Sequence, residues 1–138
     1  MKYEQSFCKA VGEWACYALC IINIAEEITG CHCNILKELE YGIDKGYITF
    51  NKNNYYDPTN FDVVEPAKFL AMMVGGRWEV RKSDDILYKP QENEYIVERW
   101  ERNGYGHFAR TRDGYNSLQD SKCVTLGKLA SIRIFKKL

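Results

Sequence analysis

Three residues that lie far apart in the sequence are of the types that nucleophilic thiol chemistry requires. Cys16 stands near the start of a strongly apolar stretch, His107 lies in a predicted strand, and Asp120 lies in the strand expected next. A thiol that attacks a carbonyl carbon needs a base beside it, and that base needs a carboxylate to orient its ring. The three residue types therefore predict an activated thiol, provided that the fold brings them together.

The stretch from Gly12 to Gly30 predicts a buried helix that carries Cys16 in its first turn. Every residue from Trp14 to Ala25 except Asn23 is apolar. A helix that is apolar on nearly all sides is buried in a fold, and so short an apolar run cannot cross a bilayer. The free N–H groups at a helix start favour an anion, so we expect a thiolate at Cys16.

Other cysteines and a structural role remain as alternatives for the nucleophile. Cys16 is also of the type that fills a core as a small apolar residue. Cys8, which lies close to Gln5, is a second candidate outside the strong helix. Cys20 follows Cys16 by one helical turn, and we expect it in the core.

A predicted hairpin sets the histidine opposite the aspartate. If Asp113 and Gly114 form a two-residue turn, His107 lies directly opposite Asp120. Residues paired in this way have Cβ atoms about 4.5–5.5 Å apart, which allows a carboxylate to hold one imidazole nitrogen. Asn116 lies too far along the strand to reach His107. A bulge would shift the partner of His107 by one position.

The remaining pattern predicts an α+β fold in one domain over residues 1–138, with helices first and an antiparallel sheet after them. A helix is expected over 35–45 with Asn34 as its N-cap, and we expect Ile35, Leu36, Leu39 and Ile43 to form its apolar stripe. A further helix is expected over 67–74, opened by Glu65 and Pro66. Strands are expected at 47–50, 77–82, 94–102, 107–112, 115–120 and 131–135, and a polar loop at 51–60.

Composition excludes one function class and indicates a location. Nineteen basic residues balance nineteen acidic ones, so the chain lacks the basic footprint of a nucleic-acid binder. The N-terminal MKYEQSFCK is polar and has no export signal, so we expect a cytoplasmic protein without a membrane anchor. Six reduced thiols fit that location, although three disulfides in a secreted chain are the alternative. The cysteines are Cys8, Cys16, Cys20, Cys31, Cys33 and Cys123.

A second cluster of reactive side chains, the two thiols and one imidazole of Cys31-His32-Cys33, raises the question of a metal site. Structural zinc sites use ligand pairs separated by two to four residues together with a second pair, and no second pair is evident here. We therefore expect an ordinary loop, without metal or cofactor. A metal-dependent regulatory domain that uses these three residues remains the weaker alternative.

The order of these motifs resembles the papain-like cysteine peptidases, and the nearest branch is the C39-like, bacteriocin-processing one. GEWACYAL resembles the start of that family's cysteine helix, and HFARTRDGYNSLQDS resembles its histidine strand, tight turn and acidic strand. The resemblance implies a papain-like fold and cleavage of a peptide or amide bond in a peptide or protein substrate. Cys16 would form the thioester, with His107 and Asp120 as its partners. The compact form also resembles small uncharacterised papain-like proteins of phages and mobile elements.

Two positions depart from that family's pattern. A small residue follows the cysteine in the family, whereas Tyr17 follows Cys16 here. The resemblance implies that Gln5 supplies the oxyanion hole, but Gln5 stands further from Cys16 than the family's glutamine stands from its cysteine. These departures predict the alternative function, a catalytically degenerate papain-like binding module that blocks or sequesters a partner protein.

Overall fold

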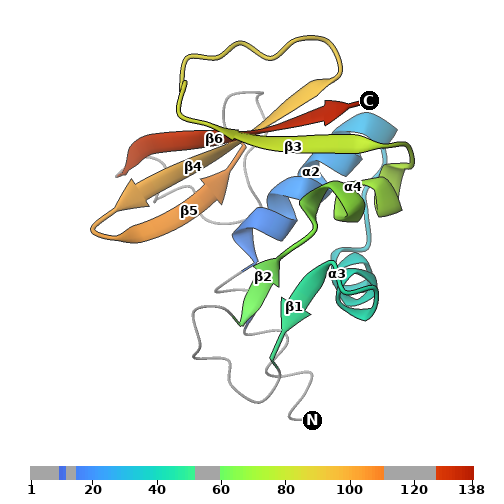
Figure 1. Cartoon of the computed structure of the whole chain (residues 1–138). Helices are drawn as coiled ribbons and strands as arrows, with labels where there is room; N and C mark the ends of the chain where they lie inside the picture. Colours follow the sequence, from blue (N-terminus) through green and yellow to red (C-terminus); the bar gives the residue numbers. More distant parts are fainter. Residues whose placement is uncertain (1–9, 12–14, 52–59, 111–126) are drawn as a thin grey trace.

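The computed structural model describes residues 10–11, 15–51, 60–110 and 127–138 (Figure 1). The fold is α+β, with helices in the N-terminal part and antiparallel strands in the C-terminal part, which confirms the predicted class. The helices are α2 (Cys16–Thr29), α3 (Ile35–Asp44) and α4 (Pro66–Val74). The strands are β1 (Ile48–Phe50), β2 (Phe61–Val63), β3 (Trp78–Ser83), β4 (Glu94–Arg102), β5 (Tyr105–Ala109) and β6 (Lys128–Lys137).

Helix α2 is the buried helix that the apolar stretch predicts. All of its residues from Ala18 to Ala25 are buried. Gly30 ends the helix in the left-handed conformation, with φ 70°, and its N–H donates to the carbonyl of Glu26. Cys16 is the first residue of the helix, as predicted. Within the part of the chain that the structure describes, no helix is both long and apolar enough to span a membrane.

Helix α3 begins as predicted and turns most of its predicted apolar stripe inward. The Asn34 side chain accepts a hydrogen bond from the Lys37 N–H at 3.3 Å, so the N-cap is confirmed. Leu39 is fully buried, and Ile35 and Ile43 are partly buried against the core. The side chain of Leu36 is exposed, so only its place in the stripe was wrong. The inward face also includes Gly42, which lets the helix approach Phe69 closely.

A small two-stranded sheet of β1 and β2 follows α3. The expected strand at 47–50 corresponds to β1, but β2 was not predicted because three residues are too few to show an alternating pattern. Asn51 closes the pair: its N–H donates to the side-chain oxygen of Asn60 at 3.0 Å. The interior of the predicted polar loop, 52–59, lies outside the described residues.

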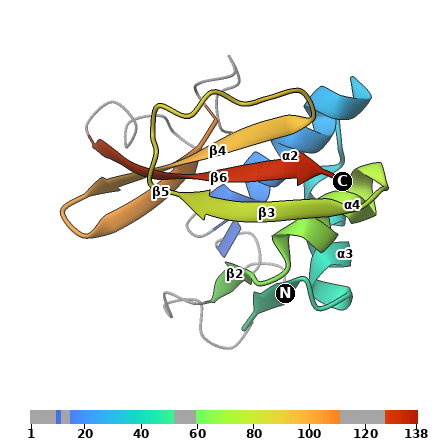
Figure 2. The same cartoon turned by 45° about the horizontal axis from the view of Figure 1, so that its top comes forward.

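The larger sheet has the order β3-β6-β4-β5, and every pairing in it is antiparallel (Figure 2). The bounds predicted for the 94–102 strand are those of β4. Strand β5 starts two residues earlier than predicted, because Asn103 and Gly104, both with positive φ, are enough for the turn. Strand β6 is longer than the predicted 131–135. The strand expected at 115–120 lies outside the described residues.

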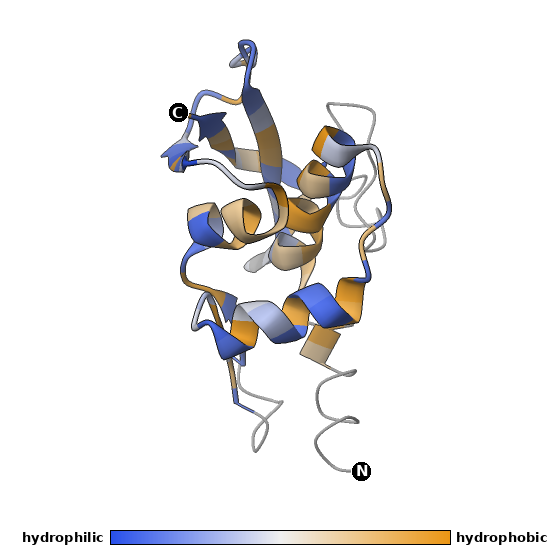
Figure 3. Cartoon of the chain, turned by 90° about the vertical axis from the view of Figure 1, so that its right-hand side faces the viewer, coloured by the Kyte–Doolittle hydropathy of each residue, from blue (hydrophilic) through white to orange (hydrophobic). Residues whose placement is uncertain are grey.

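The helices cover one face of this sheet and build the main core. Figure 1 shows α2 and α4 on the same side of the strands, and Figure 3 shows hydrophobic residues concentrated along these two helices. Trp78, Val97 and Phe135 contribute to this core from the sheet. On the opposite face, Ile96, Ile132 and Ile134 form a second cluster with Tyr88, which comes from the β3–β4 connection.

Candidate functional site

Cys16 lies where the start of α2 meets strand β5. The backbone of Phe108 lies near enough to the Cys16 thiol to lower its pKa. The next residue of the helix, Tyr17, stacks on the Phe108 ring, with the ring centroids 4.3 Å apart. Phe108 directly follows His107 in β5. The fold therefore brings the predicted thiol to the strand that carries the predicted histidine.

The protonation of Cys16 differs from the expectation for a helix start. Burial raises the pKa of the Cys16 thiol above its ordinary value, which corrects the predicted acidification. Hydrogen bonds from the backbone of Phe108 and the positive charge of Arg99 lower the pKa, but by less. A helix start supplies only a partial charge, whereas burial removes the water that would solvate a thiolate. A half-buried thiol with a raised pKa needs a cation beside it before it can act as a nucleophile at neutral pH.

His107 is half-buried in β5, where it pairs with Trp100 of β4. Its Nε2 atom is buried. Because successive residues of a strand point to opposite faces, the His107 side chain lies on the other face of β5 from the Phe108 ring. The imidazole therefore does not take part in the Tyr17–Phe108 stack.

Tyr17 occupies the position where the resembled family has a small residue, and its side chain is packed into the core. Its ring contacts Phe108 and also meets the Phe135 ring edge-on, with centroids 6.2 Å apart. Burial raises the pKa of its hydroxyl. The large side chain is thus a packing element between α2 and the sheet.

Two arginines that the sequence did not reveal flank the Phe108 ring. The guanidinium carbon of Arg99 lies 5.2 Å from the ring centroid, and that of Arg133 lies 5.4 Å from it. Burial lowers the pKa of Arg133, and the like charge of Arg99 lowers it further. A Cβ atom at Gly106 would overlap the Arg99 guanidinium, so a larger residue there would move that guanidinium from its present position. These residues come from β4, β5 and β6, and only the sheet register brings them together.

A buried arginine fastens the end of β5 to α2. Arg110 is 0% exposed, its Nε donates to the Ile96 carbonyl at 3.2 Å, and its guanidinium pairs with Glu27 at 3.3 Å. Glu27 belongs to the C-terminal part of α2, whereas Cys16 begins the same helix. The strand is therefore held against α2 at two points, which fixes the approach of Cys16 to β5.

Two predicted site residues, Gln5 and Asp120, lie outside the part of the chain that the structure describes, and so does Cys8, the alternative nucleophile. Asn116 and Cys123 also lie outside it. Cys20 is buried, as expected for a core position. All four cysteines within the described residues have free thiols, namely Cys16, Cys20, Cys31 and Cys33.

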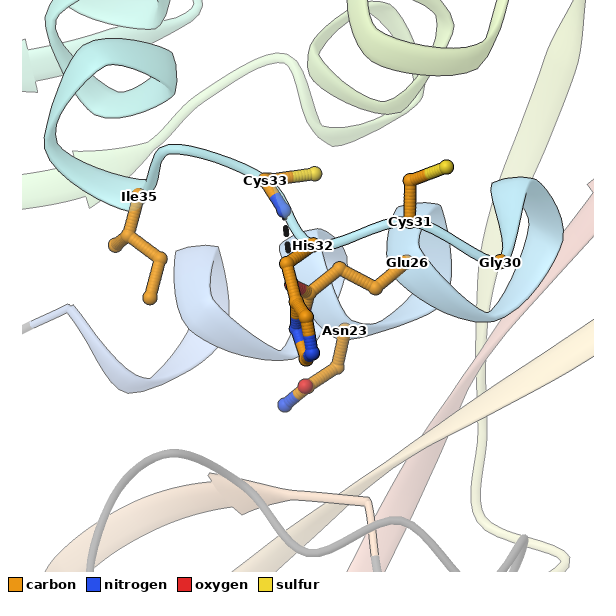
Figure 4. Close-up of a pocket in the computed structure, with 7 residues that line it drawn as sticks. All are labelled: Asn23, Glu26, Gly30, Cys31, His32, Cys33 and Ile35. Carbon is orange, nitrogen blue, oxygen red and sulfur yellow. Dashed lines mark hydrogen bonds and ion pairs between the residues drawn. The ribbon is translucent and has the colours of Figure 1, made fainter.

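The Cys31–Cys33 segment lines a pocket of about 430 Å³ beside the C-terminal half of α2 (Figure 4). Glu26 organises the segment: its Oε2 atom accepts a hydrogen bond from the Cys33 N–H at 2.9 Å and lies 3.2 Å from Nδ1 of His32. Among the described residues, no group of three or more His, Cys, Asp or Glu side chains is arranged to hold a metal ion. The alternative of a metal-dependent domain therefore gains no support here. The pocket is lined by Asn23, Glu26, Gly30, Cys31, His32, Cys33 and Ile35.

Comparisons with known proteins give one family. No curated protein and no solved structure matches the chain. A family model described as "Protein of unknown function, DUF261" matches residues 1–137. Since the match spans nearly the whole sequence, the chain belongs to the DUF261 family.

Proposed function

We propose that this protein is a cysteine hydrolase of papain-like fold that cleaves a peptide or amide bond through a thioester at Cys16. The observation that supports this most is that the start of α2 meets β5 at Phe108, whose ring stacks on Tyr17 and whose backbone lowers the pKa of the Cys16 thiol. His107 directly precedes Phe108, and consecutive Cα atoms are only about 3.8 Å apart. The thiol therefore lies against the strand that carries the proposed base.

In the proposed reaction, His107 takes the proton of Cys16, and the thiolate attacks the carbonyl carbon of the scissile bond. The tetrahedral intermediate collapses as the imidazolium gives its proton to the leaving amine, which leaves the acyl group on sulfur. His107 then takes a proton from water, whose oxygen attacks the thioester. Release of the carboxylic acid returns the proton to the thiol.

Two further residues have proposed roles that rest on the sequence. Asp120 would orient the imidazole through one ring nitrogen and stabilise the imidazolium. Gln5 would donate a hydrogen bond to the oxyanion of the tetrahedral intermediate. Arg99 would help to stabilise the Cys16 thiolate, and the support for this role is that its charge lowers the pKa of the thiol.

A second candidate function is a binding module on the same fold that has lost catalysis. The observation that favours it is the raised pKa of the Cys16 thiol. In this case Cys16 is a packing residue, and the protein acts by binding a partner protein and blocking or sequestering it.

The test is acylation of the protein by blocked-peptide thioesters, followed by mass spectrometry of the trapped adduct. A hydrolase is expected to carry the acyl group on Cys16, and to lose both the adduct and turnover in Cys16→Ala and His107→Ala. Cys20→Ala is the matched control, because Cys20 is a buried thiol one turn further along α2. Turnover that survives in Cys16→Ala would contradict the proposal, as would adducts that never reach Cys16.

We also propose that the protein works in the cytoplasm. The support is chemical: four cysteines are free although two of them, Cys31 and Cys33, lie close in sequence and within reach of solvent. Free thiols persist in a reducing compartment.

A further inference from the structure

Arg99 and Arg133 place two positive charges beside the start of α2. Their guanidinium carbons lie 5.2 and 5.4 Å from the centroid of the same Phe108 ring. Val97 and Phe135, each two residues away along its strand, belong to the core that packs against α2, so the two arginines lie on that face of the sheet. The charge of Arg99 lowers the pKa of Arg133. Two like charges are therefore held close together here.

The carboxylates around this pair leave it positively charged. Glu101 lies 3.5 Å from Nε of Arg99, but the Glu101 side chain is 54% exposed, and an exposed pair of this kind is weak. Asp84 raises the pKa of Arg133 through its charge, although within the described residues no ion pair joins the two. Nη1 of Arg133 donates to two neutral acceptors, the Ser131 hydroxyl at 3.1 Å and a backbone carbonyl at 3.4 Å. Each guanidinium carries several N–H donors, so the pair can donate to a further anion.

Solvent reaches this pair. The Arg99 side chain is 32% exposed, and Arg133 is half-buried. Gly106 is exposed, and a Cβ atom there would overlap the Arg99 guanidinium. The guanidinium thus lies over bare backbone of β5, in space that a side chain at position 106 would fill. A ligand that arrives from solvent can therefore contact Arg99.

The pair lies next to the candidate nucleophile. Tyr17, which follows Cys16 in α2, stacks on the same Phe108 ring, with centroids 4.3 Å apart. Arg99 is also close enough for its charge to lower the pKa of the Cys16 thiol. A group bound by the pair would therefore lie beside the bond that Cys16 attacks.

The planar guanidinium groups of this pair match the oxygens of a carboxylate and favour an anion over a neutral group. We propose that Arg99 and Arg133 form a subsite for a carboxylate of the substrate, so that acidic peptides are preferred. The carboxylate comes from an acidic side chain or from a free C-terminus, which share this chemistry. The preference for acidic substrates rests on the proposed hydrolase, whereas binding of a carboxylate to the pair does not require turnover.

Binding can be measured by NMR titration of the full ¹⁵N-labelled chain, observed at the side-chain Nε–H signals of Arg99 and Arg133. N-acetylglutamate methylamide carries a side-chain carboxylate, N-acetylalanine carries a terminal carboxylate, and N-acetylglutamine methylamide is the neutral match of the first. Inorganic phosphate is the fourth probe. We expect a carboxylate probe to shift both signals to saturation and the glutamine probe to bind about tenfold more weakly, and the tighter carboxylate identifies its source. Carboxylates that never saturate the signals would overturn the proposal, as would equal binding of the glutamine probe or phosphate that binds as tightly as the better carboxylate.

Two variants disturb the pair in different ways. Gly106→Ala keeps both charges and displaces the Arg99 guanidinium, and its new Cβ atom meets the flexible end of that side chain, so the fold is kept. Arg133→Gln removes one charge. Carboxylate binding should weaken about tenfold in each variant. Arg77→Gln, at an exposed position just before β3, removes the same charge and should bind as the parent does.

Unchanged carboxylate binding in either variant of the pair would refute the assignment, and so would an equal loss in Arg77→Gln. If Arg133→Gln does not fold, Gly106→Ala decides alone.

Turnover separates failure of the subsite from failure of the hydrolase. Acetylglutamyl and acetylglutaminyl thioesters are compared by kcat/KM, and the parent should favour the acidic one about tenfold, a ratio that should fall in Gly106→Ala. Equal kcat/KM for the two thioesters would overturn the subsite and leave the hydrolase standing. Carboxylate binding at the arginine pair with no acyl adduct on Cys16 would overturn the hydrolase and leave the subsite standing.

Discussion

At the scale of single residues, burial controls the protonation of the groups that matter most. Exclusion of water raises the pKa of the Cys16 thiol by more than the backbone of Phe108 and the charge of Arg99 lower it. A cysteine at a helix start is therefore not activated by its position alone. The proposed imidazolium of His107 is the further charge that a nucleophilic Cys16 requires.

Glu94 shows the opposite effect and predicts a pH-dependent contribution to stability. Its pKa is lowered by the Tyr88 hydroxyl at 2.6 Å, then by the Gln91 N–H, with Arg81 adding to the effect. Because the pKa is lower in the folded state, the stabilisation is present above the ordinary pKa of a glutamate. It is lost as the pH falls through the lowered value.

The measurement is urea unfolding of Glu94→Gln and the parent at pH 7 and near pH 3. The variant should be less stable than the parent at pH 7, and the difference should shrink at the lower pH. Glu92→Gln, at an exposed position of the β3–β4 connection, should be as stable as the parent at both pH values. A difference that grows as the pH falls would contradict the assignment of the network.

Two leucines that the sequence places alike should respond differently to truncation. Leu19 is 4% exposed in α2, so Leu19→Ala should lower the free energy of unfolding by about 2–5 kcal/mol. Leu36 is 45% exposed in α3, so Leu36→Ala should change it by less than about 0.5 kcal/mol. Urea denaturation gives both values. Similar losses in the two variants would show that the Leu36 side chain is buried as the sequence pattern predicted.

At the scale of elements, close approach of α3 to the core depends on Gly42. A Cβ atom there would lie 2.8 Å from Cδ1 of Ile48 and 2.8 Å from Cε1 of Phe69. Gly42→Ala gains about 1 kcal/mol of helix propensity, but overpacking costs about 1–3 kcal/mol. We expect a net loss of stability in thermal unfolding. Glu40→Ala, at an exposed position of the same helix, is the control; a Gly42→Ala variant as stable as this control would contradict the close approach.

The elements with strong local signals were predictable from the sequence, and those set by distant contacts were not. The apolar run of α2, the Asn34 cap of α3 and the bounds of β4 all follow from local pattern. The exposure of Leu36 depends on how α3 packs on the core, and the length of β6 depends on pairing with both β3 and β4. A sequence pattern carries no information on such contacts.

At the scale of the whole molecule, the sequence predicted which strand meets α2 but not what surrounds the meeting point. The cysteine helix and the histidine strand were identified, and their contact is a finding of the structure. Arg99, Arg133 and Arg110 were missed, because charged residues in strands usually face solvent.

The thiols provide a prediction for the whole chain. The four described cysteines are free, and we expect all six to be reduced in the native protein. Unfolding in excess alkylating reagent without reductant should therefore add six labels, counted by intact mass. A chain that accepts only four labels would contain a disulfide and would contradict the prediction.

The most direct test of the account is the rate of Cys16 alkylation by iodoacetamide as a function of pH, in the parent and in His107→Ala. If the two residues form one unit, the parent has a reactive fraction near pH 6. In His107→Ala the half-buried Cys16 thiol, with its raised pKa, should then react only at high pH. His32→Ala removes the chain's other histidine and should behave like the parent, and Asp120→Asn should have a smaller effect than His107→Ala. Identical pH–rate curves for the parent and His107→Ala would mean that Cys16 is a core residue and that the binding-module function is correct.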